Sequence, residues 1–111
     1  MRIRVSIAAA IAACLALAIA GSAVAATATK VTIKEQSDGF SGHVKSSKGK
    51  CVVSRVVVLY KQKPGKDKII GTDVADENGA WSTGNTGSTK GAFYAFAPKI
   101  TGCKAGKSKT I

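Results

Sequence analysis

The segment Cys-Val-Val-Ser-Arg-Val-Val-Val-Leu-Tyr-Lys, residues 51–61, decides the fold class. It is a β-branched run closed by an aromatic residue and followed by the chain breaker Pro64-Gly65, a pattern typical of a strand that ends in a hairpin loop. A run this apolar favours a central strand covered on both faces, with Val57 and Leu59 facing inward. Because the run begins with Cys51, the strand can also be joined covalently to another part of the chain.

Short apolar runs separated by turn residues continue through the rest of the chain. The strands expected from this pattern are residues 29–35, 40–45, 51–61, 68–75, 80–83, 91–97 and 107–111. After residue 25 no stretch has helical periodicity. Seven short strands at this spacing predict an all-β fold, a seven-stranded antiparallel Ig-like (prealbumin-like) β-sandwich that forms one domain over residues 26–111.

The first 25 residues predict a signal peptide. Arg2 and Arg4 precede an apolar stretch over Val5–Ala20, and Ala23-x-Ala25 has the small-x-small form that signal peptidase requires. We therefore expect cleavage before residue 26 and a mature chain that is secreted.

Two other interpretations of this segment are less well supported. A retained transmembrane anchor needs about 20 strongly apolar residues, and this stretch is shorter and leads into a cleavage pattern. A lipoprotein anchored through Cys14 would have a polar tether after the cysteine, whereas residues 15–20 are still hydrophobic.

Cleavage leaves two cysteines, Cys51 and Cys103, in an oxidising compartment. Two thiols allow one intramolecular pairing, so we expect a disulfide between residues 52 positions apart. In chain-entropy estimates such a bridge stabilises the fold by about 4 kcal/mol. A metal site is disfavoured, because these cysteines and the single His43 do not make a four-ligand zinc set. No cofactor is expected.

The chain is strongly basic, with a net charge of +11 that falls to about +9 when Arg2 and Arg4 are removed. One interpretation is a solvated surface with charged strand ends that resist edge-to-edge aggregation. The other is attraction to an anionic lipid surface or wall polymer. Specific nucleic-acid recognition is not expected, because the lysines are not interleaved with aromatic residues or arginines. The candidate contacts for an anionic surface are Lys61, Lys63, Lys66, Lys68, Lys99, Lys104, Lys107 and Lys109.

Catalytic chemistry has little support in the sequence. By strand alternation His43 points away from the core beside Ser41, where a lone histidine is more often inert than catalytic. The predicted strands contain no pair of carboxylates that would indicate general acid–base catalysis. We therefore expect no catalytic residues. A concave pocket with convergent polar groups around His43 or Asp76 would instead favour an enzyme.

Acidic residues gather in the segment 73–79, where Asp76-x-Asn78-Gly79 has part of a calcium-loop pattern. The segment lacks the downstream bidentate glutamate, and a turn opened by Asp76 with a positive φ at Gly79 explains the same residues. A Lys–Asn isopeptide bond is also disfavoured, because Lys30 and Lys34 have no Asn or Asp to meet in residues 107–111.

The aromatic residues are few enough that a small core could bury all of them. An exposed subset would instead suggest a platform for carbohydrate, since sugars stack on flat rings. We expect the core to take all six, which are Phe40, Tyr60, Trp81, Phe93, Tyr94 and Phe96.

Several short motifs occur together over roughly residues 38–97. They are Gly42-x-Val44, Val57-x-Leu59-Tyr60, Gly71-Thr72, Asp76-x-x-Gly79-x-Trp81 and Gly91-x-Phe93-Tyr94. This set resembles the carboxypeptidase regulatory-like (transthyretin-like, Ig-like) β-sandwich module, and the chain is similar to small lysine-rich secreted bacterial proteins with two cysteines at these positions. The resemblance implies a sandwich whose Asp-x-x-Gly-x-aromatic segment joins two strands of a hairpin. It specifies function hardly at all.

Together these observations predict a secreted, monomeric, non-enzymatic β-sandwich that acts as a structural or interaction module. The alternative is a cell-envelope or polyanion-binding protein that uses the lysines given above. A small hydrolase or a carbohydrate-binding module is less favoured.

Overall fold

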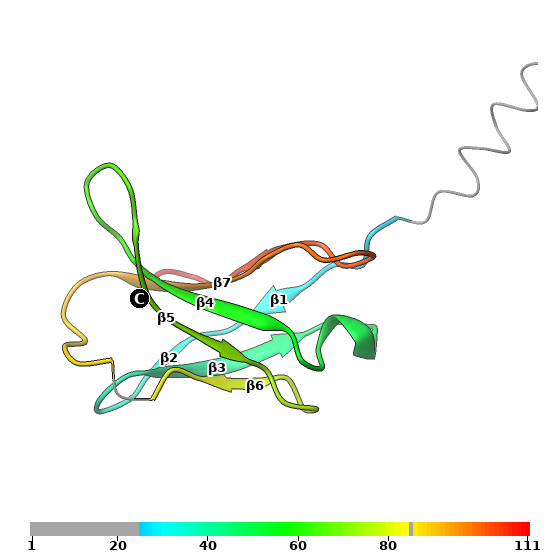
Figure 1. The fold of residues 1–111 in the computed structure, drawn as a ribbon, viewed down its shortest axis with the longest axis horizontal. Helices are drawn as coiled ribbons and strands as arrows, with labels where there is room; N and C mark the ends of the chain where they lie inside the picture. Colours follow the sequence, from blue (N-terminus) through cyan, green and yellow to red (C-terminus); the bar gives the residue numbers. More distant parts are fainter. Residues whose placement is uncertain (1–24, 85) are drawn as a thin grey trace, which may run out of the picture.

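The computed structural model describes residues 25–84 and 86–111, and in this part the chain forms two antiparallel β-sheets packed face to face (Figure 1). The predicted signal peptide, except for Ala25, lies outside the described residues. The strands are β1 (Lys30–Val31), β2 (Lys34–Glu35), β3 (Phe40–Lys45), β4 (Val56–Lys61), β5 (Lys68–Val74), β6 (Ala80–Ser82), β7 (Phe93–Ala97) and β8 (Gly106–Lys107). The described part contains no helix that is long and apolar enough to span a membrane.

The first sheet is built around β3, which pairs with β6 on one edge and with both β1 and β2 on the other. The predicted strand 29–35 is therefore divided in two. At the division the hydroxyl of Thr32 replaces its carbonyl as the acceptor of the His43 amide, at 2.9 Å. The Thr32 carbonyl lies instead over Gly42, where an added Cβ would come within 1.9 Å of it. Because of this break, the described residues contain eight strands rather than the seven predicted.

The second sheet has the strand order β5-β4-β7-β8, so the segment 51–61 does supply a central strand. A β-bulge lies between Leu59 and Tyr60 in the pairing with β5. At the far edge β8 is short, but backbone hydrogen bonds from Ser108 to Ala95 and between Ile111 and Phe93 continue the pairing to the end of the chain. The predicted edge strand over residues 107–111 is thus close to what the structure has.

The core lies between the two sheets and receives alternate residues from each strand, as the period of two requires. Phe40 and Val44 come from β3, Val57 and Leu59 from β4, and all four are at most 1% exposed. Phe93 of β7 packs on Phe40 with ring centroids 4.5 Å apart. The predicted inward direction of Val57 and Leu59 is confirmed.

The start of the central strand differs from the prediction. Cys51 ends a short 3₁₀ helix, η1 (Gly49–Cys51), and the strand begins only at Val56. Between them the chain turns through Ser54, a non-glycine residue with φ of 58°. The β-branched residues favour a strand here, but tertiary contacts of the neighbouring cysteine and arginine override that preference.

The prediction that both faces of β4 are covered is also only half right. Its inner face is buried, but Val56 on the outer face is 45% exposed. The aromatic residues divide in the same way. Phe40, Trp81 and Phe93 belong to the core between the sheets, and Tyr94 is also buried, although it lies on the outer face of the second sheet. Tyr60 and Phe96 are partly exposed on that outer face, so the prediction that the core takes all six aromatic residues is wrong for these two.

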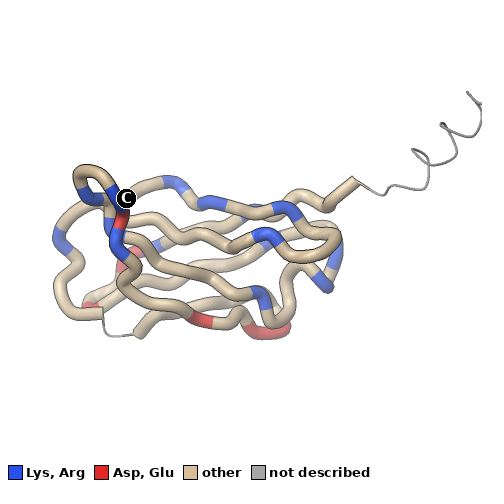
Figure 2. Tube along the Cα trace, turned by 45° about the horizontal axis from the view of Figure 1, so that its top comes forward, with Lys and Arg blue, Asp and Glu red and all other residues tan. Residues whose placement is uncertain are grey.

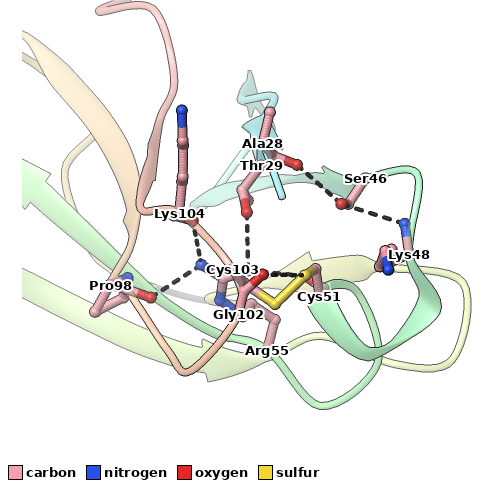
Figure 3. Close-up of a disulfide and its surroundings, with 10 residues drawn as sticks. All are labelled: Ala28, Thr29, Ser46, Lys48, Cys51, Arg55, Pro98, Gly102, Cys103 and Lys104. Atoms are coloured by element: carbon pink, nitrogen blue, oxygen red, sulfur yellow. Dashed lines mark hydrogen bonds between the residues drawn. A yellow bond between two sulfur atoms is a disulfide. The ribbon is translucent and has the colours of Figure 1, made fainter. Parts of the chain in front are cut away.

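One end of the sandwich, which we call the disulfide pole, is closed by a covalent bond between Cys51 and Cys103 (Figure 3). Both cysteines are fully buried, and their Cα atoms are 5.6 Å apart. The pairing is the one that the cysteine count predicts. A disulfide is consistent with an oxidising, extracellular location.

Beside the disulfide lies Arg55, a charged residue that is only 1% exposed (Figure 3). Its Nη1 donates to the Cys51 carbonyl at 2.9 Å and to the Thr29 hydroxyl at 3.0 Å. Its Nη2 donates to the carbonyls of Pro98 and Lys104 at 3.0 and 2.8 Å. None of these four acceptors is a carboxylate, and burial lowers the pKa of Arg55. The guanidinium thus connects three backbone carbonyls and one side-chain hydroxyl at this pole.

Candidate functional site

Two concave regions are candidates for a site, and the first lies at the first sheet. We call it the polar groove. It has a volume of about 740 Å³, and its lining includes His43, Asp73, Asp76, Lys34 and Ser82. His43 is exposed, as strand alternation predicts. The groove therefore supplies the concavity with polar side chains that would favour an enzyme.

The polar groove does not assemble a linked acid and base. Asp73 accepts a hydrogen bond from the amide of Ser82 at 2.7 Å, and Asp76 accepts from the amides of Asn78 and Ala80 at 2.8 and 2.9 Å. Among the described residues, no hydrogen bond connects His43 to either carboxylate. One oxygen of each carboxylate is engaged with backbone amides, which is the contact by which Asp side chains stabilise turns and strand ends.

The same contacts confirm the predicted turn at Asp76, because Gly79 adopts a φ of 82° and donates its amide to the Asp76 carbonyl. No three His, Cys, Asp or Glu side chains in residues 25–84 and 86–111 gather in a way that could hold a metal ion.

The second candidate lies on the outer face of the second sheet, where a hollow of about 360 Å³ is lined by aromatic rings and charged side chains. Tyr60 of β4 stacks on Tyr94 of β7 with ring centroids 5.2 Å apart, and it meets Phe96 edge-on at 6.4 Å. We call this region the aromatic–lysine site, and its residues are Tyr60, Lys66, Asp67, Tyr94, Phe96 and Lys107.

The β4–β5 hairpin loop is attached to this site by one strong hydrogen bond. The hydroxyl of Tyr94 donates to the Asp67 carboxylate at 2.5 Å, and the second carboxylate oxygen accepts the amide of Lys63 at 3.2 Å. The bond to Tyr94 is the main cause that lowers the pKa of Asp67, and the same bond raises the pKa of Tyr94 to about 12. At neutral pH both groups are therefore in the protonation states that keep the loop in place.

The structure brings together only two of the eight lysines that the sequence proposed for an anionic surface. Lys66 from the hairpin loop and Lys107 from β8 line the same hollow. The ammonium of Lys107 lies 4.3 Å from the centroid of the Tyr94 ring, a cation–π contact.

The other six lysines lie elsewhere or contribute differently. Lys61 approaches the Phe93 ring at 5.7 Å, and Lys109 lines a separate hollow beside Lys30. Lys104 lies at the disulfide pole, where its carbonyl accepts from Arg55 (Figure 3). Lys63, Lys68 and Lys99 are exposed. The predicted set is therefore not one surface.

Basic and acidic positions are unevenly distributed over the molecule. Figure 2 shows Lys and Arg at both ends and along the upper strands, while most Asp and Glu lie along the lower edge of that view. This separation leaves the second sheet and the loops at its ends predominantly positive, which is the electrostatic condition for attracting an anionic partner.

Sequence reasoning missed two residues of structural importance. It assigned no role to Arg55, and it did not predict the hydrogen bond from Tyr94 to Asp67. A usable signal existed for the aromatic residues: alternation along residues 56–60 already places Tyr60 on the face opposite Leu59.

No family model, curated protein or solved structure matches this chain. The resemblance to the carboxypeptidase regulatory-like module and the Ig-like topology therefore stay predictions.

Proposed function

We propose that the mature chain is a secreted, non-enzymatic interaction module that binds an anionic surface of the cell envelope through the aromatic–lysine site. The single observation that carries the proposal is the convergence of Lys66 and Lys107, from distant parts of the chain, on one hollow. The net charge of about +9 in the expected mature chain supplies long-range attraction, and the hollow supplies a place where that attraction can become a contact.

The polar groove supports the non-enzymatic part of the proposal. Its two carboxylates accept backbone amides, so neither is positioned as a partner for His43. The rival function is a small hydrolase at this groove. It predicts that His43→Ala abolishes hydrolysis of ester or peptide substrates, whereas our proposal predicts no such activity to abolish.

The test compares two double variants that remove the same charge from different places. Lys66→Gln with Lys107→Gln changes the aromatic–lysine site, and Lys99→Gln with Lys104→Gln changes exposed lysines outside it. Both variants lose two positive charges, so attraction by net charge alone predicts equal effects on binding.

Binding is measured by co-sedimentation of the secreted protein with cell-envelope fragments at ~50 mM and ~300 mM salt. We expect the site variant to bind about tenfold more weakly than wild type at low salt and the control variant to lose about twofold or less. Equal losses in the two variants would contradict the site. Absence of binding by the wild-type protein at low salt would contradict the function.

A further inference from the structure

The outer face of the second sheet is apolar well beyond the aromatic–lysine site. Every outward side chain of β4 and β7 is aliphatic or aromatic, and β5 adds two more aliphatic residues in register with them. We call this region the apolar sheet face, and it comprises Val56, Val58, Tyr60, Ile69, Val74, Tyr94 and Phe96.

Three aliphatic residues of this face are half exposed. Val56 is 45%, Val74 is 55% and Ile69 is 57% exposed, although the first two lie directly opposite each other in the β4–β5 pairing. An outward strand face in water normally carries polar residues. Between these aliphatic residues the exposed Thr72 of β5 lies opposite Val58, which is 9% exposed, so the apolar exposure is concentrated at the two ends of the face. Exposed apolar surface on a small domain marks a region that another body covers.

The charges around the face decide what kind of body this is. Lys66 and Lys107 border it at the hollow, where Asp67 is engaged by Tyr94, whereas Val74 lines the polar groove together with Asp73 and Asp76. The free charge at the hollow is therefore positive, and a second copy would add further lysines to the same interface. These lysines, with the net charge of about +9, favour an anionic partner. It must also offer an apolar interior for the half-exposed aliphatic side chains.

The arrangement of the rings argues against a sugar polymer as that partner. Sugars stack on the flat faces of aromatic rings. Tyr94 has its faces engaged by Tyr60 from the strand on one side and by Lys107 from the strand on the other. An anionic lipid bilayer, in contrast, combines phosphate groups for lysines with an acyl boundary for Val and Ile side chains.

We propose that the apolar sheet face docks onto an anionic lipid bilayer. Ile69, Val74 and Val56 enter the boundary between headgroups and acyl chains, the tyrosines lie at headgroup level, and Lys66 and Lys107 bind lipid phosphates. The proposal rests on the proposed function and names the anionic surface as lipid. The Tyr94–Asp67 hydrogen bond holds the hairpin loop, and with it Lys66, beside the face.

The experiment again uses matched variants. Ile69→Thr with Val74→Thr removes apolar surface from the face, and Ile100→Thr with Val53→Thr removes one Ile and one Val that are 41% and 45% exposed outside it. Threonine is β-branched and keeps strand propensity. The protein used is residues 26–111, which contains every described strand and the disulfide.

Partition is measured on vesicles of phosphatidylcholine with about 30 mol% phosphatidylglycerol and on soluble polyphosphate, at ~100 mM salt. We expect the face variant to bind the anionic vesicles about tenfold more weakly than wild type and the control variant about twofold or less. Both variants should keep the wild-type affinity for polyphosphate, because their charge is unchanged. Circular dichroism spectra and melting curves of both variants serve as the control that they are folded.

The possible failures are distinguishable. Equal vesicle binding by the two variants overturns lipid docking but leaves the anionic-surface function standing. Absence of binding to vesicles and polyphosphate alike overturns both proposals. A wild-type dimer in sedimentation equilibrium that the face variant converts to monomer shows that a second copy covers the face, and this also overturns lipid docking.

Discussion

At the disulfide pole a charged arginine is buried, and on the apolar sheet face an isoleucine is more than half exposed. Arg55 is 1% exposed and makes four hydrogen bonds within the chain, whereas Ile69 is 57% exposed on the outer edge strand of its sheet. The two regions invert the usual distribution of residue types. At the pole the disulfide and the hydrogen bonds of Arg55 hold distant parts of the chain together. On the face the apolar side chains remain available to a partner. Changes at the pole should therefore alter stability, and changes at the face should alter binding.

The largest effect is expected from removing the disulfide. Replacing both cysteines, Cys51→Ser with Cys103→Ser, frees a loop of about 52 residues in the unfolded chain. We expect a loss of about 4 kcal/mol in the free energy of unfolding and a fall of well over 10 °C in melting temperature. Differential scanning calorimetry measures the change.

Below its melting temperature the serine variant should bind anionic vesicles as wild type does, because neither cysteine belongs to the apolar sheet face. Mass spectrometry of the exported protein provides a separate check. It should give a chain that begins near Ala26 and is two hydrogens lighter than its reduced form. A free thiol at either cysteine would contradict the bridge.

The second effect in size is expected from Arg55→Met, which keeps the length of the side chain but removes its donors. The carbonyls of Cys51, Pro98 and Lys104 then lose buried donors. We expect a loss of about 3 kcal/mol, measured by urea denaturation.

The control for this change is Lys50→Met, an exposed residue of η1 in the same region. Its effect should stay within about 0.5 kcal/mol. If Arg55→Met is equally mild, the guanidinium does not organise the pole, and the contrast between the two regions weakens.

A smaller effect is expected at the Tyr94–Asp67 bond and should appear as a titration. Asp67→Asn removes the carboxylate that raises the pKa of Tyr94 to about 12, so this pKa should fall toward the usual value of about 10. The ultraviolet absorbance of tyrosinate measures the change. Tyr94→Phe, which removes the titrating group, identifies which of the two tyrosines is responsible.

The same bond makes stability depend on pH at both extremes. Asp67 has a lowered pKa, so its contribution is present above about pH 4 and is lost as the pH falls through the folded-state pKa. Tyr94 has a raised pKa, so its contribution is present below about pH 10 and is lost as the pH rises through about 12. Asp67→Asn should flatten both limbs of a melting-temperature profile. An unchanged profile would show that the loop is held by other contacts.

The smallest effect on stability is expected from Lys66→Gln with Lys107→Gln. Both side chains lie at the surface of the hollow, so the free energy of unfolding should change by no more than about 0.5 kcal/mol. A thermal melt measures this change alongside the binding assay described above. A large destabilisation would mean that the cation–π contact of Lys107 with Tyr94 belongs to the fold rather than to a site.

The sequence alone was sufficient where a property depends on neighbouring residues. The period of two along residues 40–45 and 56–60 places Phe40, Val44, Val57 and Leu59 on the inner faces, and the structure confirms this. The turn at Asp76 follows from local side-chain-to-backbone chemistry and the conformational freedom of Gly79. The disulfide pairing follows from a count, because two cysteines have only one intramolecular partner.

The structure was needed where distant segments meet. No local pattern marks Arg55 for burial, since three of its four acceptors, on Thr29, Pro98 and Lys104, come from parts of the chain that only the folded pole brings together. The break in the first strand at Thr32 depends on the carbonyl lying over Gly42 in the neighbouring strand. The pairing of Lys66 with Lys107 depends on the loop bending toward Tyr94, through a hydrogen bond between residues 27 positions apart.

Alternation along a strand therefore determined from sequence which residues share a face, because side-chain direction is a property of the backbone. Whether a face is covered was decided only by the tertiary structure, because cover is supplied by other strands. For Leu59 that cover is the opposing sheet. No strand of the described chain covers Val56, Ile69 and Val74 to the same extent, and they stay about half exposed. The proposed docking face therefore lies on the side of β4 that the sequence predicted to be covered.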